Sequence, residues 1–383
     1  MPLYDYDKML STAEERVRKA DYCEENKELI FKFERSLFLE GLKKPRILKY
    51  VSQLNVMAEW HDFKFSEVTR EDIEILYETI AKSDRKEYTK HDYLIAIKRF
   101  FRWMNGGKDP EYTEWINPKI KNPTKLPEEL LTEEDIISMI QAAAHPRDKA
   151  IIALFWDAGG RTGELGNLKI KHIVFDRYGA VAIVDGKTGM RRIRLVSSVP
   201  YIAAWLDIHP HKDDPESYLW VGIGIRGRGK QLNYAALRMQ IKRIAEKAGI
   251  KKRVYNHLFR HSRSTNLAQY LTESQMKEHL GWTQDSKMAA IYVHMSGKQT
   301  DTAILKMHGI VKEEDDMPQL TTRLCPRCKQ VNGPTSDFCS RCGMALTVDV
   351  AVDVEKKRSD IAIALMELVE KDPEVAKILK DAL

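Results

Sequence analysis

The sequence lacks the features that define several large classes of protein. No apolar run reaches the length that a bilayer span needs, and the N-terminal stretch MPLYDYDKMLSTAEERVRKA lacks the basic and apolar regions of a signal peptide. There is no G-x-x-x-x-G-K-[ST] loop for nucleotide phosphates, and no paired carboxylates indicate a two-metal site. We therefore expect a soluble, cytoplasmic protein without a membrane partner.

Cysteine is also scarce, because the chain of 383 residues has only five. Cys23 stands alone, and the other four form two C-x-x-C pairs in CPRCKQVNGPTSDFCSRCG, namely Cys325, Cys328, Cys339 and Cys342. Two such turns bring four thiolates to the corners of a tetrahedron, which suits a structural Zn²⁺ ion, with a rubredoxin-type iron centre as the alternative. Because a four-thiolate site has no open coordination position, we do not expect this metal to be catalytic.

Charged residues are abundant but nearly balanced, since 62 Lys and Arg against 56 Asp and Glu give a formal net charge of +6. So mild an excess indicates a polyanionic partner only where basic residues cluster. Helical periodicity predicts four helices, at roughly 26–40, 44–61, 70–82 and 87–105. We assign residues 1–25 to an N-terminal arm, 26–106 to a helical domain and the Gly- and Pro-rich stretch 107–127 to a linker.

The second half of the chain has a different pattern. Residues 128–312 predict a mixed domain of helices with one antiparallel hairpin, in which AVAIVDG and RRIRLVS flank a turn that carries Lys187. An acidic linker at 313–323 leads to the Cys-rich module at 324–346, and residues 355–383 predict amphipathic helices. The predicted fold class is therefore mostly α with a small antiparallel β-sheet.

Several basic side chains of the mixed domain are candidates for binding an anion. Arg161 follows two glycines, and Glu164 lies three residues later, where it can hold the guanidinium or cap the helix. His257 and Arg260 lie one turn apart at the start of NHLFRHSRSTNLAQYL, so both can face one anion. Taken singly, each of these residues has a simple structural explanation, and only their order along the chain favours a common site.

That order resembles the tyrosine recombinase (phage integrase) family. GGRTGELGNLK resembles the first arginine box of the family, VDGKTGMRRIRL its hairpin-lysine box, HLFRHSRSTNL its H-x-L-R-H-[ST] box and LGWTQDSKMAAIYVH its nucleophile box. The sequence departs from the pattern at Phe259, where leucine is usual, at Trp282, where histidine is usual, and by one extra residue before Tyr292. The Cys-rich module and the tail resemble additions found in archaeal integrases of viruses or plasmids.

The resemblance implies a mechanism for DNA strand cleavage. Arg161 and Arg260 would bind the non-bridging oxygens of a DNA phosphate, and Glu164 would orient Arg161. Tyr292 would be the nucleophile that forms a 3′-phosphotyrosyl bond. Because that bond stores the energy of the broken phosphodiester, the reaction would need neither a nucleotide cofactor nor a catalytic metal.

The other matched residues would complete the catalytic set. By resemblance, Lys187 is the general acid for the departing 5′ oxygen, and His257 assists proton transfer and holds the phosphate. Trp282 would pack against the site or donate its indole N–H. Two residues of the same stretch keep two interpretations each: His261 belongs to the family box or only supports the site, and Arg263 contacts the DNA backbone or solvent.

The resemblance also implies the partners. We expect a site-specific recombinase or integrase that acts on chromosomal double-stranded DNA, as a monomer without DNA and as a homo-tetramer on synapsed sites. A type IB topoisomerase-like enzyme and a non-catalytic DNA-binding protein are the alternatives. The tail has an apolar stripe that packs on its own chain or on a partner helix, and it consists of Ile361, Leu365, Leu368 and Val369.

Overall fold

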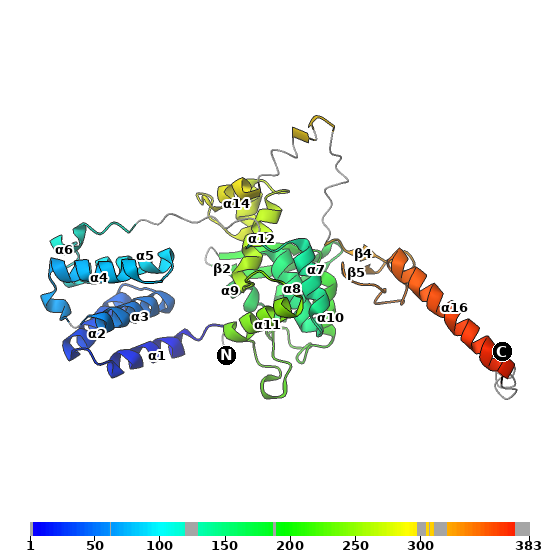
Figure 1. The fold of residues 1–383 in the computed structure, drawn as a ribbon, viewed down its shortest axis with the longest axis horizontal. Coiled ribbons are helices and arrows are strands. Elements are labelled where there is room, and N and C mark those ends of the chain that lie inside the picture. Colours follow the sequence, from blue (N-terminus) through cyan, green and yellow to red (C-terminus); the bar gives the residue numbers. More distant parts are fainter. Residues whose placement is uncertain are drawn as a thin grey trace. The chain divides into compact units, whose positions relative to one another are not determined.

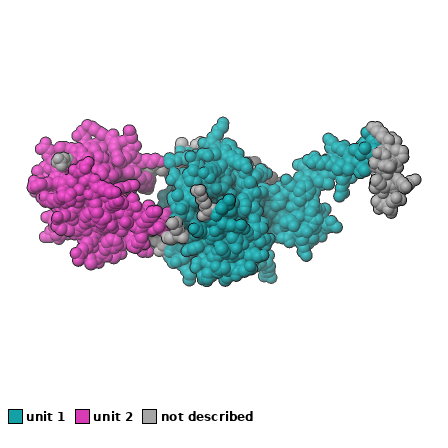
Figure 2. Space-filling model, turned by 90° about the horizontal axis from the view of Figure 1, so that it is seen from below, with its two compact units in different colours: residues 1–3, 125–383 teal, residues 4–124 magenta. Residues whose placement is uncertain are grey.

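A computed structural model of the protein describes residues 3–61, 63–118, 129–186, 189–296, 304–305, 307–309 and 320–371. The chain divides into two compact units (Figure 2): residues 4–124, here the helical unit, and residues 1–3 with 125–383, here the mixed unit. Most of the described residues outside loops are helical, and the strands form two small antiparallel sheets, which confirms the predicted fold class. Among the described helices, none is both long and apolar enough to cross a bilayer.

The helices of the helical unit form a bundle (Figure 1). They enclose one aromatic-rich core. Its elements are α1 (Tyr6–Lys19), α2 (Glu24–Leu39), α3 (Lys44–Trp60), the short 3-10 helix Phe65–Glu67, α4 (Arg70–Lys82), α5 (Glu87–Met104) and α6 (Glu111–Glu114). Helices α2 to α5 lie nearly within the predicted bounds, because their buried faces follow the helical period. Thr69 and Asp72 cap the start of α4 reciprocally.

Two further helices lie in stretches that the sequence analysis assigned to an arm and a linker. Leu10 and Val17 of α1 are buried in the core of the helical unit. After α6, Ile116 is buried in the same core, and Lys98 of α5 donates hydrogen bonds from Nζ to the carbonyl oxygens of Thr113 and Ile116, both at 3.3 Å. Helix α1 and the segment from α6 to Ile116 therefore pack as parts of the helical unit.

The mixed unit contains a three-stranded antiparallel sheet and a group of helices. The elements before and within the sheet are α7 (Glu133–Ala142), α8 (Pro146–Ala158), α9 (Thr162–Gly166), the 3-10 helix Ile170–His172, β1 (Ile173–Asp176), β2 (Gly179–Gly186) and β3 (Gly189–Leu195). The predicted hairpin is β2–β3, in which Val184 pairs with Arg191 and Gly186 with Gly189. Strand β1 was not predicted and extends the sheet in the order β1-β2-β3.

Helices follow the sheet in the mixed unit. They are α10 (Val199–Asp207), the 3-10 helix Ile225–Gly227, α11 (Tyr234–Lys247), α12 (Asn256–Leu267), α13 (Glu273–Leu280) and α14 (Met288–Ser296). Helix α8 lies in the middle of the unit and is buried on all sides against α7, α10, α12 and β3. Leu3 also belongs to this unit, because its carbonyl oxygen accepts from the Tyr234 N–H at 2.9 Å and its side chain packs on Gly166.

The Cys-rich module contains the two-residue strands β4 (Arg323–Leu324) and β5 (Val331–Asn332). It contacts α10, since the Tyr201 hydroxyl lies 2.7 Å from Thr335 Oγ1 and accepts the Thr335 N–H at 3.1 Å. Helix α16 (Val348–Lys371) begins before the predicted tail helices. Ile361, Leu365 and Leu368 of its stripe are exposed, whereas the side chain of Val369 lies outside the described residues.

Candidate active site

The turn between α8 and α9 presents Arg161. Gly159 ends α8 in the left-handed conformation, with φ of 56°, and Arg161 is the residue before α9. The Glu164 carboxylate accepts from the Arg161 backbone N–H at 2.9 Å and from its Nη1 at 2.8 Å. The contact expected from the three-residue spacing is therefore present, and the carboxylate both caps α9 and holds the guanidinium.

Helix α12 contributes Arg260 from its first turns. Its side chain is buried, and it donates from Nη1 to the Gly159 carbonyl at 3.2 Å and from Nη2 to the Leu280 carbonyl at 2.8 Å. Burial, reinforced by the nearby charge of Arg161, lowers the pKa of Arg260 to about 10. The guanidinium therefore remains positive at neutral pH and is available to an anion.

Strand β3 contributes a third guanidinium, that of Arg191, which is not among the residues expected at the site. Arg191 Nη2 donates to Glu164 Oε2 at 2.7 Å, and Arg191 Nε donates to the His279 carbonyl at 3.1 Å. A signal for it was present, because Arg191 shares the strand period of Ile193 and Leu195, which are fully buried. An arginine on the inward face of a strand is a candidate for a buried ionic role.

The end of α13 brings the three guanidiniums together. The consecutive carbonyl oxygens of His279, Leu280 and Gly281 each accept a hydrogen bond from a different arginine, namely Arg191, Arg260 and Arg161, at 3.1, 2.8 and 3.0 Å. These carbonyls lie at the negative end of the helix dipole, which stabilises cations. Gly281 ends the helix in the left-handed conformation, with φ of 64°. The helix terminus thus offsets the mutual repulsion of the three cations.

Helix α14 places Tyr292 beside this cluster. The side chain is 3% exposed, and its ring stacks on Trp282 with centroids 5.5 Å apart and planes 4° apart. The Arg260 guanidinium lies 5.4 Å from the Trp282 ring centroid. Burial raises the pKa of Tyr292 to about 12, although the charge of Arg260 acts in the opposite direction. The hydroxyl is therefore protonated throughout the physiological range.

Two histidines of α12 lie on the side of Tyr292. His261 Nδ1 lies 2.5 Å from the Tyr292 hydroxyl oxygen, and the exposed His257 ring meets the His261 ring edge-on with centroids 4.7 Å apart. Arg263 does not lie in solvent, which was one of the two environments expected for it. Its side chain is largely buried, donates to Asn266 Oδ1 at 2.6 Å and lies 3.8 Å from Asp157 Oδ1. It therefore forms a buried ion pair with Asp157.

Lys187 lies outside the described residues, as does Thr188. The strand residue before it, Gly186, lies directly against Glu164, because a Cβ built on this glycine would be 2.3 Å from Glu164 Oε1. The described end of the hairpin therefore adjoins the arginine cluster.

The four cysteines of the C-terminal module converge. The Sγ atoms of Cys325, Cys328, Cys339 and Cys342 all lie within 4.8 Å of one another. Two pairs approach to 3.6 and 3.5 Å, which fits the separation of about 3.8 Å in a tetrahedral Zn²⁺ site with Zn–S bonds of about 2.3 Å. Each knuckle closes with a left-handed residue, Lys329 in the first and Gly343 in the second, with φ of 60° and 70°. This donor set suits a structural metal.

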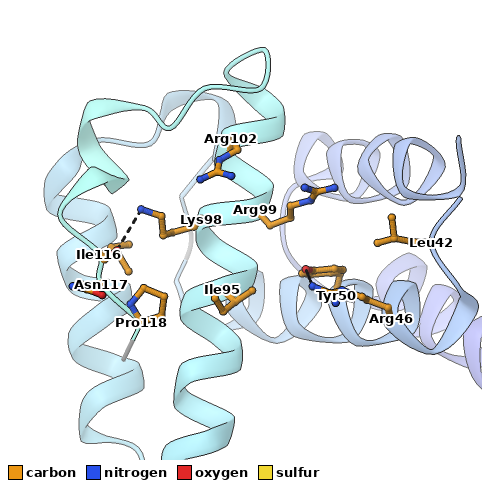
Figure 3. Close-up of a pocket in the computed structure, with 10 residues that line it drawn as sticks. All are labelled: Leu42, Arg46, Tyr50, Ile95, Lys98, Arg99, Arg102, Ile116, Asn117 and Pro118. Carbon is orange, nitrogen blue, oxygen red and sulfur yellow. Dashed lines mark hydrogen bonds between the residues drawn. The ribbon is translucent and has the colours of Figure 1, made fainter. Parts of the chain in front are cut away.

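The helical unit has a basic cleft of about 580 Å³ between α3 and α5 (Figure 3). Its cationic lining residues are Arg46, Lys98, Arg99 and Arg102. Asp109 accepts both ends of the Arg102 guanidinium, and Arg99 forms an ion pair with Glu40. Arg46 is exposed and donates to the Tyr50 hydroxyl at 3.4 Å. Lys98 also lies 3.6 Å from Asp109, so the four cations face two carboxylates and the cleft keeps an excess of positive charge.

Comparison with known proteins identifies the family. Residues 129–299, which contain the arginine cluster and Tyr292, match the sequence model of the phage integrase family. Residues 129–299 belong to the tyrosine recombinase (phage integrase) family. The chain is accordingly a tyrosine-type site-specific DNA recombinase, an enzyme that breaks and rejoins DNA.

The recombinase is similar to archaeal and bacterial proteins over most of their length. It is 27% identical over 281 residues to tyrosine recombinase XerA from Pyrococcus horikoshii. The matched region covers 73% of this chain and 94% of that protein. It is 24% identical to tyrosine recombinase XerD from Vibrio cholerae, which covers 68% of this chain and 88% of that protein. The family assignment thus rests on relatives that extend well beyond the catalytic motifs.

Solved structures share the fold of the recombinase. A XerH site-specific recombinase bound to palindromic difH substrate in a post-cleavage complex has a TM-score of 0.54 at 19% identity, covering 80% of this chain and 99% of that one. A lambda integrase dimer bound to a COC′ core site has a TM-score of 0.57 at 17% identity, covering 69% and 76%. At these identities the likeness establishes the fold alone.

Proposed function

We propose that Tyr292 cleaves a DNA strand by attacking a phosphate that Arg161 and Arg260 hold. The observation that carries the proposal is an excess of positive charge beside a buried tyrosine. Arg161, Arg191 and Arg260 supply three positive charges and Glu164 one negative charge, so the cluster has a net charge of 3 − 1 = +2. A phosphodiester brings one negative charge, and a second develops in its transition state, which the cluster would neutralise.

The bond changes follow from this arrangement. The Tyr292 oxygen forms a bond to phosphorus, and the bond from phosphorus to the 5′ oxygen breaks. By family resemblance Lys187 donates the proton that this 5′ oxygen takes up, and His257 assists the transfer and holds the phosphate. Trp282 fixes the tyrosine ring by stacking, and Glu164 orients Arg161. The 5′ hydroxyl of a partner strand then attacks the phosphotyrosine, so the exchange consumes no nucleotide and uses no catalytic metal.

Double-stranded chromosomal DNA in the cytoplasm is the proposed substrate. The basic cleft between α3 and α5 supports phosphate contacts from the helical unit, and their affinity would depend on salt. One of the solved structures with a similar fold is a lambda integrase tetramer bound to a Holliday junction. We extend this to a homo-tetramer of the recombinase on synapsed DNA and a monomer without DNA.

The proposed metal is one structural Zn²⁺ ion per chain. Cys325, Cys328, Cys339 and Cys342 would hold it and close the two knuckles of the C-terminal module. The ion supplies folding free energy to a module that has few buried apolar residues of its own, and it takes no part in strand cleavage. The contact of Thr335 with Tyr201 would then attach the folded module to α10.

Mapping the covalent protein–DNA junction tests the proposal. The recombinase is incubated with fragmented genomic DNA, adducts are trapped with denaturant, and the attached residue and cleavage site are identified by mass spectrometry and sequencing. A duplex nicked next to the mapped site then serves as a suicide substrate. We expect Tyr292→Phe to bind this duplex as tightly as the wild type and to form no adduct.

Tyr270→Phe is the matched control. This residue follows the end of α12 and is 48% exposed, so its replacement should leave adduct formation intact. Adduct formation by Tyr292→Phe, or a junction at another residue, would overturn the assignment of the nucleophile.

A further inference from the structure

Arg191 of strand β3 forms hydrogen bonds to two other elements of the proposed active site. Its guanidinium bridges two elements, because it donates to the Glu164 carboxylate of α9 and to the His279 carbonyl at the end of α13. Its side chain is nine-tenths buried, and within the described residues its Nη1 atom has no hydrogen-bond partner. An unsatisfied donor on a buried cation is costly and points to a functional reason.

The same carboxylate also holds Arg161. Glu164 Oε1 accepts from Arg161 Nη1, and Oε2 accepts from Arg191 Nη2 and from the Arg161 backbone. If Arg161 were its only partner, Glu164 would neutralise the Arg161 guanidinium, whose positive charge is needed to bind the phosphate. With two guanidiniums on one carboxylate, the group of three keeps one positive charge.

We propose that Arg191 is a positioning residue that neutralises Glu164, so that Glu164 can orient Arg161 without cancelling its charge toward the DNA phosphate. This inference rests on the proposed function, and it assigns a task to a residue whose hydrogen bonds go to Glu164 and His279 rather than to the proposed nucleophile. The hydrogen bonds from Arg191 and Arg161 lower the pKa of the Glu164 carboxyl even though burial by itself would raise it, so the carboxylate is charged and needs a counterion.

The packing around Arg191 fixes its place. A Cβ on Gly281 would be 2.6 Å from Arg191 Nη1 and 2.8 Å from its Cζ, so the guanidinium lies directly against the backbone of the helix terminus that also holds Arg161 and Arg260. Arg191 therefore connects the hairpin that carries Lys187 to the two phosphate-binding arginines. Arg192, the next residue on β3, is exposed and provides a control on the same strand.

Variants at Arg191 and Glu164 separate a charge role from a packing role. Arg191→Met removes the charge and leaves Glu164 paired with Arg161 alone, so we expect adduct formation at saturating DNA to slow by about 10- to 100-fold with little change in DNA affinity. Arg191→Lys keeps the charge and should retain more of the rate. Arg192→Met should react as the wild type does.

The decisive variant is Arg191→Met combined with Glu164→Gln. It restores the net charge of the cluster to that of the wild type, since Arg161 and Arg260 then contribute +2 with no carboxylate to subtract. We expect the double variant to form the adduct at least about fivefold faster than Arg191→Met, although it has lost more hydrogen bonds. A double variant as slow as Arg191→Met or slower would overturn the inference, because that result is the one expected of a packing role.

A measurement without DNA separates this inference from the proposed function. Introducing Glu164→Gln should lower the thermal unfolding midpoint more in the wild-type background than in the Arg191→Met background. In the Arg191→Met background Glu164 has already lost one counterion, so its replacement removes less stabilisation. If the wild type forms no adduct but this coupling is present, the proposed function fails and the ionic role of Arg191 is retained. Equal effects of Glu164→Gln in both backgrounds would overturn that ionic role, whether or not the wild type forms an adduct.

Discussion

His261 Nδ1 lies 2.5 Å from the hydroxyl oxygen of Tyr292, within hydrogen-bond distance of the proposed nucleophile. The pKa of Tyr292 is raised to about 12 by burial, so only about one hydroxyl in 10⁵ is ionised at pH 7. A buried phenol of this kind needs a proton acceptor if it is to attack phosphorus at neutral pH. His261 has the geometry to accept that proton. The sequence alone did not decide whether His261 belongs to the site or only supports it.

Replacing His261 should reveal the acceptor in the pH dependence of cleavage. In His261→Phe the phenolic proton must go to solvent, so the rate of adduct formation should rise nearly tenfold per pH unit between pH 7 and 9. The wild type should vary much less over that range, because a neutral histidine takes the proton. The measurement is quenched-flow adduct formation on the suicide substrate.

His261→Gln distinguishes proton acceptance from positioning. The glutamine amide can still hydrogen-bond to the tyrosine hydroxyl but cannot take its proton. If this variant has the flat profile and rate of the wild type, His261 only positions Tyr292, and the assignment as acceptor is wrong.

Gly281→Ala should disturb the arginine cluster directly. The new Cβ would meet the Arg191 guanidinium at 2.6 Å, and the residue also has a φ of 64°, which costs alanine about 1–2 kcal/mol. We expect slower adduct formation together with this loss of stability. Gly249→Ala is the control, because Gly249 has a φ of 73° and no atom within 4 Å of a built Cβ. It should lose similar stability in denaturant titrations but cleave normally, and equal cleavage by both variants would count against the cluster geometry.

Metal analysis tests the four-cysteine site. We expect close to one zinc per chain in the wild type and in Cys23→Ser, and almost none in Cys339→Ser. Co²⁺ substitution should give the absorption of a tetrahedral thiolate site. Cys339→Ser should unfold the C-terminal module, because the module loses its metal. It should still form the DNA adduct, because an ion without an open coordination position takes no part in cleavage. Bound iron in place of zinc would contradict the choice of metal.

The basic cleft predicts a change in salt dependence. Arg46→Gln removes an exposed cation at the cleft, so DNA affinity should fall and the slope of log K against log salt should decrease by about 0.9. Lys32→Gln removes a charge from α2, where Lys32 pairs with Glu28, and should leave the slope unchanged. The measurement is fluorescence anisotropy of labelled duplex at several salt concentrations, and equal slopes for both variants would exclude the cleft as a phosphate contact.

The sequence by itself determined the elements that depend on local pattern. Helices α2 to α5 have a clear helical period, and the β2–β3 hairpin has two β-rich runs on either side of a short turn. The contact between Arg161 and Glu164 follows from a three-residue spacing at a helix start, and the convergence of four cysteines follows from two C-x-x-C turns. Each of these relationships spans few residues, so local stereochemistry is sufficient to fix it.

Only the tertiary structure decided how distant residues meet. Arg191 reaches Glu164 and His279 because the β2–β3 hairpin packs beside both α9 and α13, and no local pattern records that arrangement. Arg263 was undecided because its partner Asp157 lies on α8, about a hundred residues earlier. Burial depends on the packing of the whole unit. Burial also raises the pKa of Tyr292. Because the side chain is buried, its hydroxyl contacts His261 rather than solvent.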